Sequence, residues 1–97
     1  MFTGTLHADV LLPGDSRTLK VKRGYVKPVL AALRKLEVSA AEVGATEKYG
    51  RVEFGVAVVS GSASQISVVL DECERLLVDR PELELLAVQR RLYHYED

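Results

Sequence analysis

Two stretches of the chain alternate between apolar and polar residues in the way that half-buried β-strands do. The first ends at the turn signal of Pro13, Gly14 and Asp15, and its apolar side is formed by Phe2, Leu6, Ala8, Val10 and Leu12. The second covers residues 51–58, where the apolar positions are Val52, Phe54, Val56 and Val58. Shorter strands are predicted over residues 38–43 and 84–93, and the polar residues 44–50 close a hairpin.

Two other stretches repeat their apolar residues at helical spacing. The first carries Leu19, Val26, Val29, Leu30, Leu33 and Leu36, and either Ser16 or Thr18 supplies its N-cap. Gly24 and Pro28 interrupt this helix, so it is predicted either to kink there or to begin near Tyr25. The second helix follows a turn over residues 60–64, ends before Pro81, and carries Ile66, Val69, Leu70, Cys73, Leu76 and Leu77.

The predicted order of strand, helix, strand, strand, helix and strand defines an α+β fold of the split βαβ type. Both helices must cover the same face of the sheet, and right-handed crossovers place the strands in the order 4-1-3-2. The sequence therefore predicts one ferredoxin-like sandwich over residues 1–97, with a four-stranded antiparallel sheet and two helices on one face.

The amino-acid composition indicates which classes of protein this chain can belong to. The chain has 97 residues, 47% of them hydrophobic, which suits one small core. It contains no run of about 20 apolar residues for a membrane span and no secretory signal pattern. The lone Cys73 suits a reducing compartment, and its place in the apolar stripe of the second helix predicts an inert thiol. We therefore expect a cytoplasmic protein with no membrane partner, no metal and no cofactor.

The charge pattern adds a candidate site. Formal net charge is only −1, yet residues 17–35 hold seven cations and no acid. On a helical wheel with Val26 at zero, four of these cations fall between about 60° and 120°, beside the apolar arc. Such one-signed clustering near a helix start favours phosphate, so the predicted phosphate or nucleic-acid contacts are Arg17, Lys20, Lys22, Arg23, Lys27 and Arg34. The alternative is a solvated helix face paired in part with Asp15 or Glu37.

Lys22 differs from the other cations because it falls inside the apolar arc, at about 320°. Its ammonium must therefore reach past the sheet edge or find a partner within the protein.

The sheet face away from the helices offers weaker candidates. His7 and Asp9 share that face, and Arg51, Glu53, Glu42 and Arg91 join them if the predicted registers hold. A small enzyme working from His7, Glu42 and Glu53 would need a defined pocket there, and the usual catalytic and nucleotide-binding motifs are absent from the sequence. The central strands also lack the outward aromatic residues on which RNA-recognition motifs stack bases.

Four segments carry a family resemblance over almost the whole chain: Gly4-Thr5-Leu6, residues 18–23 reading TLKVKR, residues 38–44 reading VSAAEVG and residues 55–60 reading GVAVVS. With these the chain resembles the small bacterial YlxP-like proteins, an uncharacterised family also described as domain of unknown function 503. The resemblance implies a ferredoxin-like fold. Family members are often encoded near transcription and translation factors, which implies work on RNA or the ribosome, and no catalytic residues come with the resemblance.

The sequence thus favours a non-enzymatic RNA-binding or ribosome-associated module that contacts phosphates through the basic entrance of its first helix. The alternative is an oligomeric interaction module or a small-ligand regulatory module, built by pairing open sheet faces or edge strands.

Overall fold

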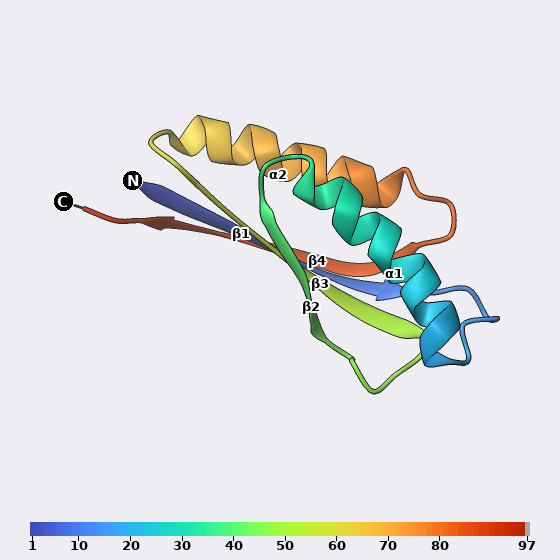
Figure 1. The fold of residues 1–97 in the computed structure, drawn as a ribbon. Coiled ribbons are helices and arrows are strands. Elements are labelled where there is room, and N and C mark those ends of the chain that lie inside the picture. Colours follow the sequence, from blue (N-terminus) through green and yellow to red (C-terminus); the bar gives the residue numbers. More distant parts are fainter. Residues whose placement is uncertain (97) are drawn as a thin grey trace.

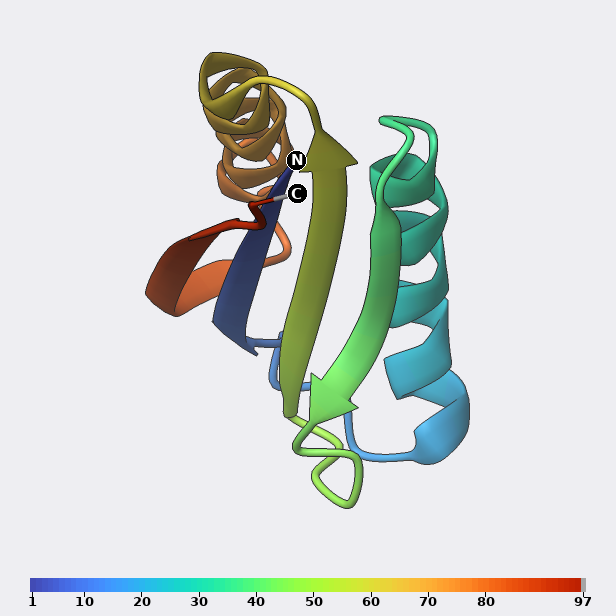
Figure 2. The same ribbon diagram turned by 90° about the vertical axis from the view of Figure 1, so that its left-hand side faces the viewer.

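The computed structural model describes residues 1–96 and confirms the predicted βαββαβ order. The elements are β1 (Phe2–Leu11), α1 (Leu19–Arg34), β2 (Ser39–Gly44), β3 (Arg51–Ser60), α2 (Ala63–Val78) and β4 (Glu84–His94). All neighbouring strands are antiparallel, in the order β2-β3-β1-β4, which is the predicted order 4-1-3-2 read from the other edge. The four strands lie side by side in Figure 2, and both helices cover one face of the sheet (Figure 1).

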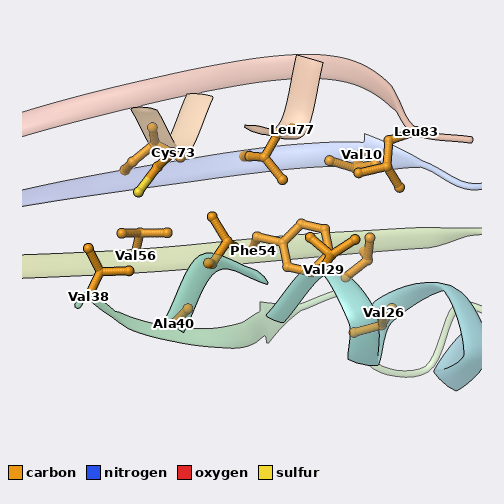
Figure 3. Close-up of a cluster of buried hydrophobic side chains, with 14 of the residues drawn as sticks. Val10, Val26, Val29, Val38, Ala40, Phe54, Val56, Cys73, Leu77 and Leu83 are labelled. Atoms are coloured by element: carbon orange, nitrogen blue, oxygen red, sulfur yellow. The ribbon is translucent and has the colours of Figure 1, made fainter. Parts of the chain in front are cut away.

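The core lies between the sheet and the helices, as the alternation in the sequence requires. Even-numbered residues of β1 and β3 face the helices, and Ala8, Val10, Val52 and Phe54 have no exposed surface at all. Both helices contribute to the same core, in which Val29 of α1 and Cys73 and Leu77 of α2 pack near Phe54 and Val56 (Figure 3). Odd-numbered residues of β1 and β3 lie on the opposite face, which no element of the described chain covers.

Capping explains where the helices begin. The side chain of Thr18, not that of Ser16, caps α1 by accepting a hydrogen bond from the Val21 amide. The helix is continuous from Leu19 through Pro28, so the alternative start near Tyr25 is wrong. Ser62 caps α2 in the same way, through the Gln65 amide.

Edge strand β4 is attached to α2 by charged side chains. Arg90 donates to Asp71 at 2.8 Å and to Glu74 at 3.1 Å. The carboxylates of α2 therefore lie over β4, at the opposite edge of the sheet from β2, along which α1 runs (Figure 2). Within residues 1–96, neither helix has the length and apolar character needed to cross a lipid bilayer.

Candidate nucleic-acid interface

Three of the predicted cations lie together on the outer surface of α1. Lys20, Arg23 and Lys27 are all exposed, and they surround a shallow depression of about 600 Å³ whose remaining lining is Leu19, Gly24 and Pro28. Because Gly24 has no side chain, it leaves a depression in the helix surface between the three cations. We call Lys20, Arg23 and Lys27 the basic flank.

The basic flank is not neutralised by carboxylates of the described chain. Within residues 1–96, none of its three cations has a carboxylate oxygen within 4.0 Å, and the first turn of α1 contains no acidic residue. Asp15 instead accepts a hydrogen bond of 2.8 Å from the Tyr25 hydroxyl, and this bond raises the pKa of Tyr25. The described cations therefore make no ion pair with Asp15 or Glu37, and of the alternative only the solvated helix face remains.

The prediction that Lys22 contacts phosphate is wrong. Its side chain is only 2% exposed. The Nζ atom donates to the carbonyl oxygens of Ala45 at 2.9 Å and Lys48 at 2.6 Å, and Glu42 Oε1 lies 2.8 Å away. The Glu42 contact is an ion pair, and the Glu42 Oε1 atom in it is buried. An ammonium enclosed in this way cannot contact phosphate. Of the two arrangements expected for a lysine inside the apolar arc, the structure has the one in which the ammonium binds partners within the protein.

The Lys22 ammonium and its three oxygen partners, here called the Lys22 site, fix the β2–β3 connection against the start of α1. Figure 2 shows this connection beside the first turn of α1. Two further bonds attach the same connection: Ser16 Oγ donates to the Tyr49 carbonyl at 2.6 Å, and the Leu12 amide donates to the Gly50 carbonyl at 2.9 Å. Ser16, considered as a helix cap from sequence, is buried because it serves this contact.

The two outlying cations of the predicted site have different surroundings. Arg17 precedes α1, is exposed, and donates from Nε to the Gly14 carbonyl at 3.2 Å. Arg34, at the end of α1, donates from Nε and Nη2 to the Ala40 carbonyl at 3.2 and 2.9 Å. Arg17 remains available beside the basic flank, whereas the Arg34 guanidinium is engaged in attaching α1 to β2.

The polar group expected on the uncovered sheet face is only partly assembled. His7 Nε2 lies 2.7 Å from Glu53 Oε1, and Arg51 makes two bonds to Asp9, at 3.1 and 2.6 Å, which raise the pKa of Arg51. Glu42 is not among them, because it lies on the helix side at the Lys22 site. The proposed trio of His7, Glu42 and Glu53 is therefore wrong.

A trough does lie beside His7 on this face. It has a volume of about 310 Å³, its floor is formed by the small residues Ala41, Gly55 and Ala57, and His7 and Val43 stand at its sides. The sequence did not indicate the trough, because its shape depends on which small residues of β2 and β3 lie beside one another. Among residues 1–96, no three His, Cys, Asp or Glu side chains are grouped as metal ligands.

Cys73 is fully buried in α2, as the sequence predicted, and burial raises the pKa of its thiol. We expect iodoacetamide to modify the native protein at least ~1,000-fold more slowly than the denatured protein at the same pH, because only rare opening exposes the thiolate. Mass spectrometry of timed samples measures both rates. Equal rates would show that the sulfur is reachable in the folded state.

The sheet order and the two helices on one face define a ferredoxin-like α+β sandwich, and known structures agree. The chain is similar to the de novo designed ferredoxin-fold protein LFR1 1, with 13% identity and a TM-score of 0.55. The similarity covers 98% of this chain and 88% of that protein. The chain is also similar to Rv0793 of Mycobacterium tuberculosis, over 98% and 96% of the two chains, with 14% identity and a TM-score of 0.50. At these identities the similarity shows the fold alone.

Sequence comparison gives the family. Residues 3–90 match the family described as protein of unknown function (DUF503). The uncharacterized protein YlxP of Bacillus subtilis (strain 168) is 34% identical over 71 residues, which cover 72% of this chain and 77% of that protein. The chain belongs to the DUF503 family, and the resemblance found in the sequence is confirmed.

Proposed function

We propose that this protein is a non-enzymatic cytoplasmic module that binds the phosphate backbone of structured RNA, free or in the ribosome, through its basic flank, with Arg17 in support. The observation that carries the proposal is the exposure of Lys20, Arg23 and Lys27 around one depression, with no carboxylate of residues 1–96 paired to them. Lys22 and Arg34 have no part in it.

Electrostatics supports phosphate as the ligand. Cations in the first turns of a helix are opposed by the helix dipole, and a bound anion removes this cost. Lys20, Arg23 and Lys27 lie three and four residues apart, so they occupy neighbouring turns and can follow a strand of phosphates. Contacts of this kind position a protein on RNA without reading its sequence, so the expected ligand is recognised by shape and charge.

The test is the salt dependence of binding to a double-stranded RNA hairpin, measured by fluorescence anisotropy. Three phosphate contacts predict that affinity falls about 20- to 40-fold between 50 and 200 mM salt, given slopes of about −0.7 to −0.9 per contact. The variant with Lys20, Arg23 and Lys27 all changed to Ala should lose most of its affinity at low salt, and its slope should fall by about 2 to 3.

A charge-matched control separates the basic flank from net charge. Lys35, Lys48 and Arg75 are exposed at three different places, and changing all three to Ala removes the same charge without touching the basic flank. This control should bind nearly as well as the unaltered chain. Equal binding by the basic-flank variant, or no binding by the unaltered chain at low salt, would refute the proposal.

A tagged pull-down from lysate, with and without ribonuclease, tests whether the protein associates with the ribosome. The recovered material is analysed for ribosomal RNA.

A further inference from the structure

The sheet face opposite the helices is left uncovered by the described chain, and it is partly apolar. Exposed large hydrophobic side chains lie on it at both ends and at its β2 edge: Val59 (63% exposed), Val43 (56%), Tyr93 (50%) and Leu11 (40%). Uncovered faces of this kind mark interaction sites. We call this surface the open face.

The formal charges on the open face cancel: Asp9 is paired with Arg51, Glu53 is hydrogen-bonded to His7, and Arg91 is an exposed cation on β4. The Asp9 and Glu53 side chains keep only 23% and 33% of their surface. Covering groups that are already paired and already half-desolvated costs less than covering free charges. The open face therefore suits a partner surface that is approximately neutral. The open face of a second copy of this chain is such a surface.

The open face also has a depressed half and a raised half. Strand pairing defines one row of Ser39, Ala57, Thr5 and Arg91, and a second row of Ala41, Gly55, His7 and Gln89, each running from β2 to β4. In both rows the residues of β2 and β3 are small and those of β1 and β4 are larger. The trough of about 310 Å³ lies over the small half.

We propose that two copies of this chain form a homodimer by packing their open faces together, around a two-fold axis that runs parallel to the strands between β1 and β3. This axis places β4 of each copy over β2 of the other, so each raised half enters the opposing depressed half. His7 then faces Gly55 of the second copy and closes the trough, Gln89 faces Ala41, and Arg91 faces Ser39 at the rim.

The available area just reaches what such a dimer needs. Strands β1 and β3 have ten residues each, whereas the six residues of β2 limit its overlap with β4 of the second copy, so the two faces overlap over roughly 500 Å² per copy. The resulting total of about 1,000 Å² lies at the threshold for a specific interface. Both α1 helices remain on the outside of the dimer, so the inference does not depend on RNA binding and does not interfere with it.

The mass in solution tests the dimer. Sedimentation equilibrium of the unaltered chain should give twice the 10.7 kDa of one copy. Ala57→Arg places an unpaired charge at the centre of the interface and should raise the dimer dissociation constant at least ~30-fold. The matched control Val68→Arg changes an exposed valine on the outer surface of α2 and should leave the mass unchanged. Circular dichroism melting establishes that each variant is folded.

Ser39 tests the position of the axis with little risk to folding, because it is exposed on the edge strand β2. Opposite Arg91 of the second copy, Ser39→Glu should tighten the dimer and Ser39→Arg should weaken it, by about two- to fivefold each. Three results would overturn the proposal: a monomeric unaltered chain, a folded Ala57→Arg variant that still dimerises normally, or Ser39 variants that change affinity in the opposite order.

Discussion

Lys22→Met should lower the free energy of unfolding by about 3–5 kcal/mol, because removing one member of a buried ion pair leaves the other charge without a partner. Methionine keeps the apolar stem of the side chain but leaves Glu42 and the carbonyls of Ala45 and Lys48 facing a group that cannot donate. In a domain of this size, the midpoint of thermal unfolding should fall by about 12 °C or more. Urea denaturation followed by circular dichroism measures the change.

Two further variants show whether the loss comes from the Lys22 site. Lys20→Met makes the same replacement on the exposed surface of α1 and should change stability by less than about 0.5 kcal/mol. Adding Glu42→Gln to Lys22→Met removes the unpaired carboxylate and should recover part of the loss. A Lys22→Met variant as stable as Lys20→Met would show that the buried ion pair contributes nothing to the fold.

The Lys22 result also separates the structural cations from those available for RNA. A variant that includes Lys22→Ala is destabilised at the Lys22 site, and any binding lost through unfolding would be mistaken for a lost phosphate contact. The basic flank must therefore be tested through Lys20, Arg23 and Lys27 alone. Within residues 1–96, their side chains make no hydrogen bond and no ion pair.

The fold could be predicted because its signals are local and repeat along the chain. In β1 and β3 every second residue faces the core, so the apolar alternation gives both the strands and their buried side. The helical period of α1 likewise placed Lys20, Arg23, Lys27 and Arg34 on one exposed flank, and the first three lie there, whereas the Arg34 guanidinium is bonded to the Ala40 carbonyl. Pro28 led to the wrong alternative of a helix that begins near Tyr25. In the structure α1 is continuous across Pro28, and Val26 and Val29 on either side of it pack into the core.

The internal partners of the cations could not be predicted, because they are distant in the sequence. The Lys22 ammonium is bound by carbonyls 23 and 26 residues away, in a connection that turns through a left-handed Ala45 with φ of 58°. Glycine or asparagine would have signalled that conformation, whereas alanine gives no sign of it. The trough on the open face was missed for a similar reason: Ala41, Gly55 and Ala57 meet only through strand register.

Gly4→Ala should destabilise the protein by about 1–3 kcal/mol through overpacking, although alanine normally suits a strand better than glycine. Gly4 lies on β1 directly beneath α2, where an added Cβ would overlap Cγ2 of Ile66 and approach Cδ1 of Leu70 at 3.2 Å. Ile66 is only 2% exposed and cannot move aside without displacing the core. Gly24→Ala is the matched control: nothing lies within 4 Å of the added atom in the interior of α1, so it should stabilise by about 0.5–1 kcal/mol.

A double-mutant cycle identifies the cause of the Gly4→Ala loss. Ile66→Ala alone creates a cavity and should cost about 2–5 kcal/mol, but with Gly4→Ala the new methyl group occupies part of that cavity. The double variant should therefore cost less than the sum of the single variants, by about 0.5–3 kcal/mol measured by urea denaturation. Strict additivity would mean that α2 does not rest on Gly4, and a stabilised Gly4→Ala variant would mean that the helix lies farther from β1 than the structure places it.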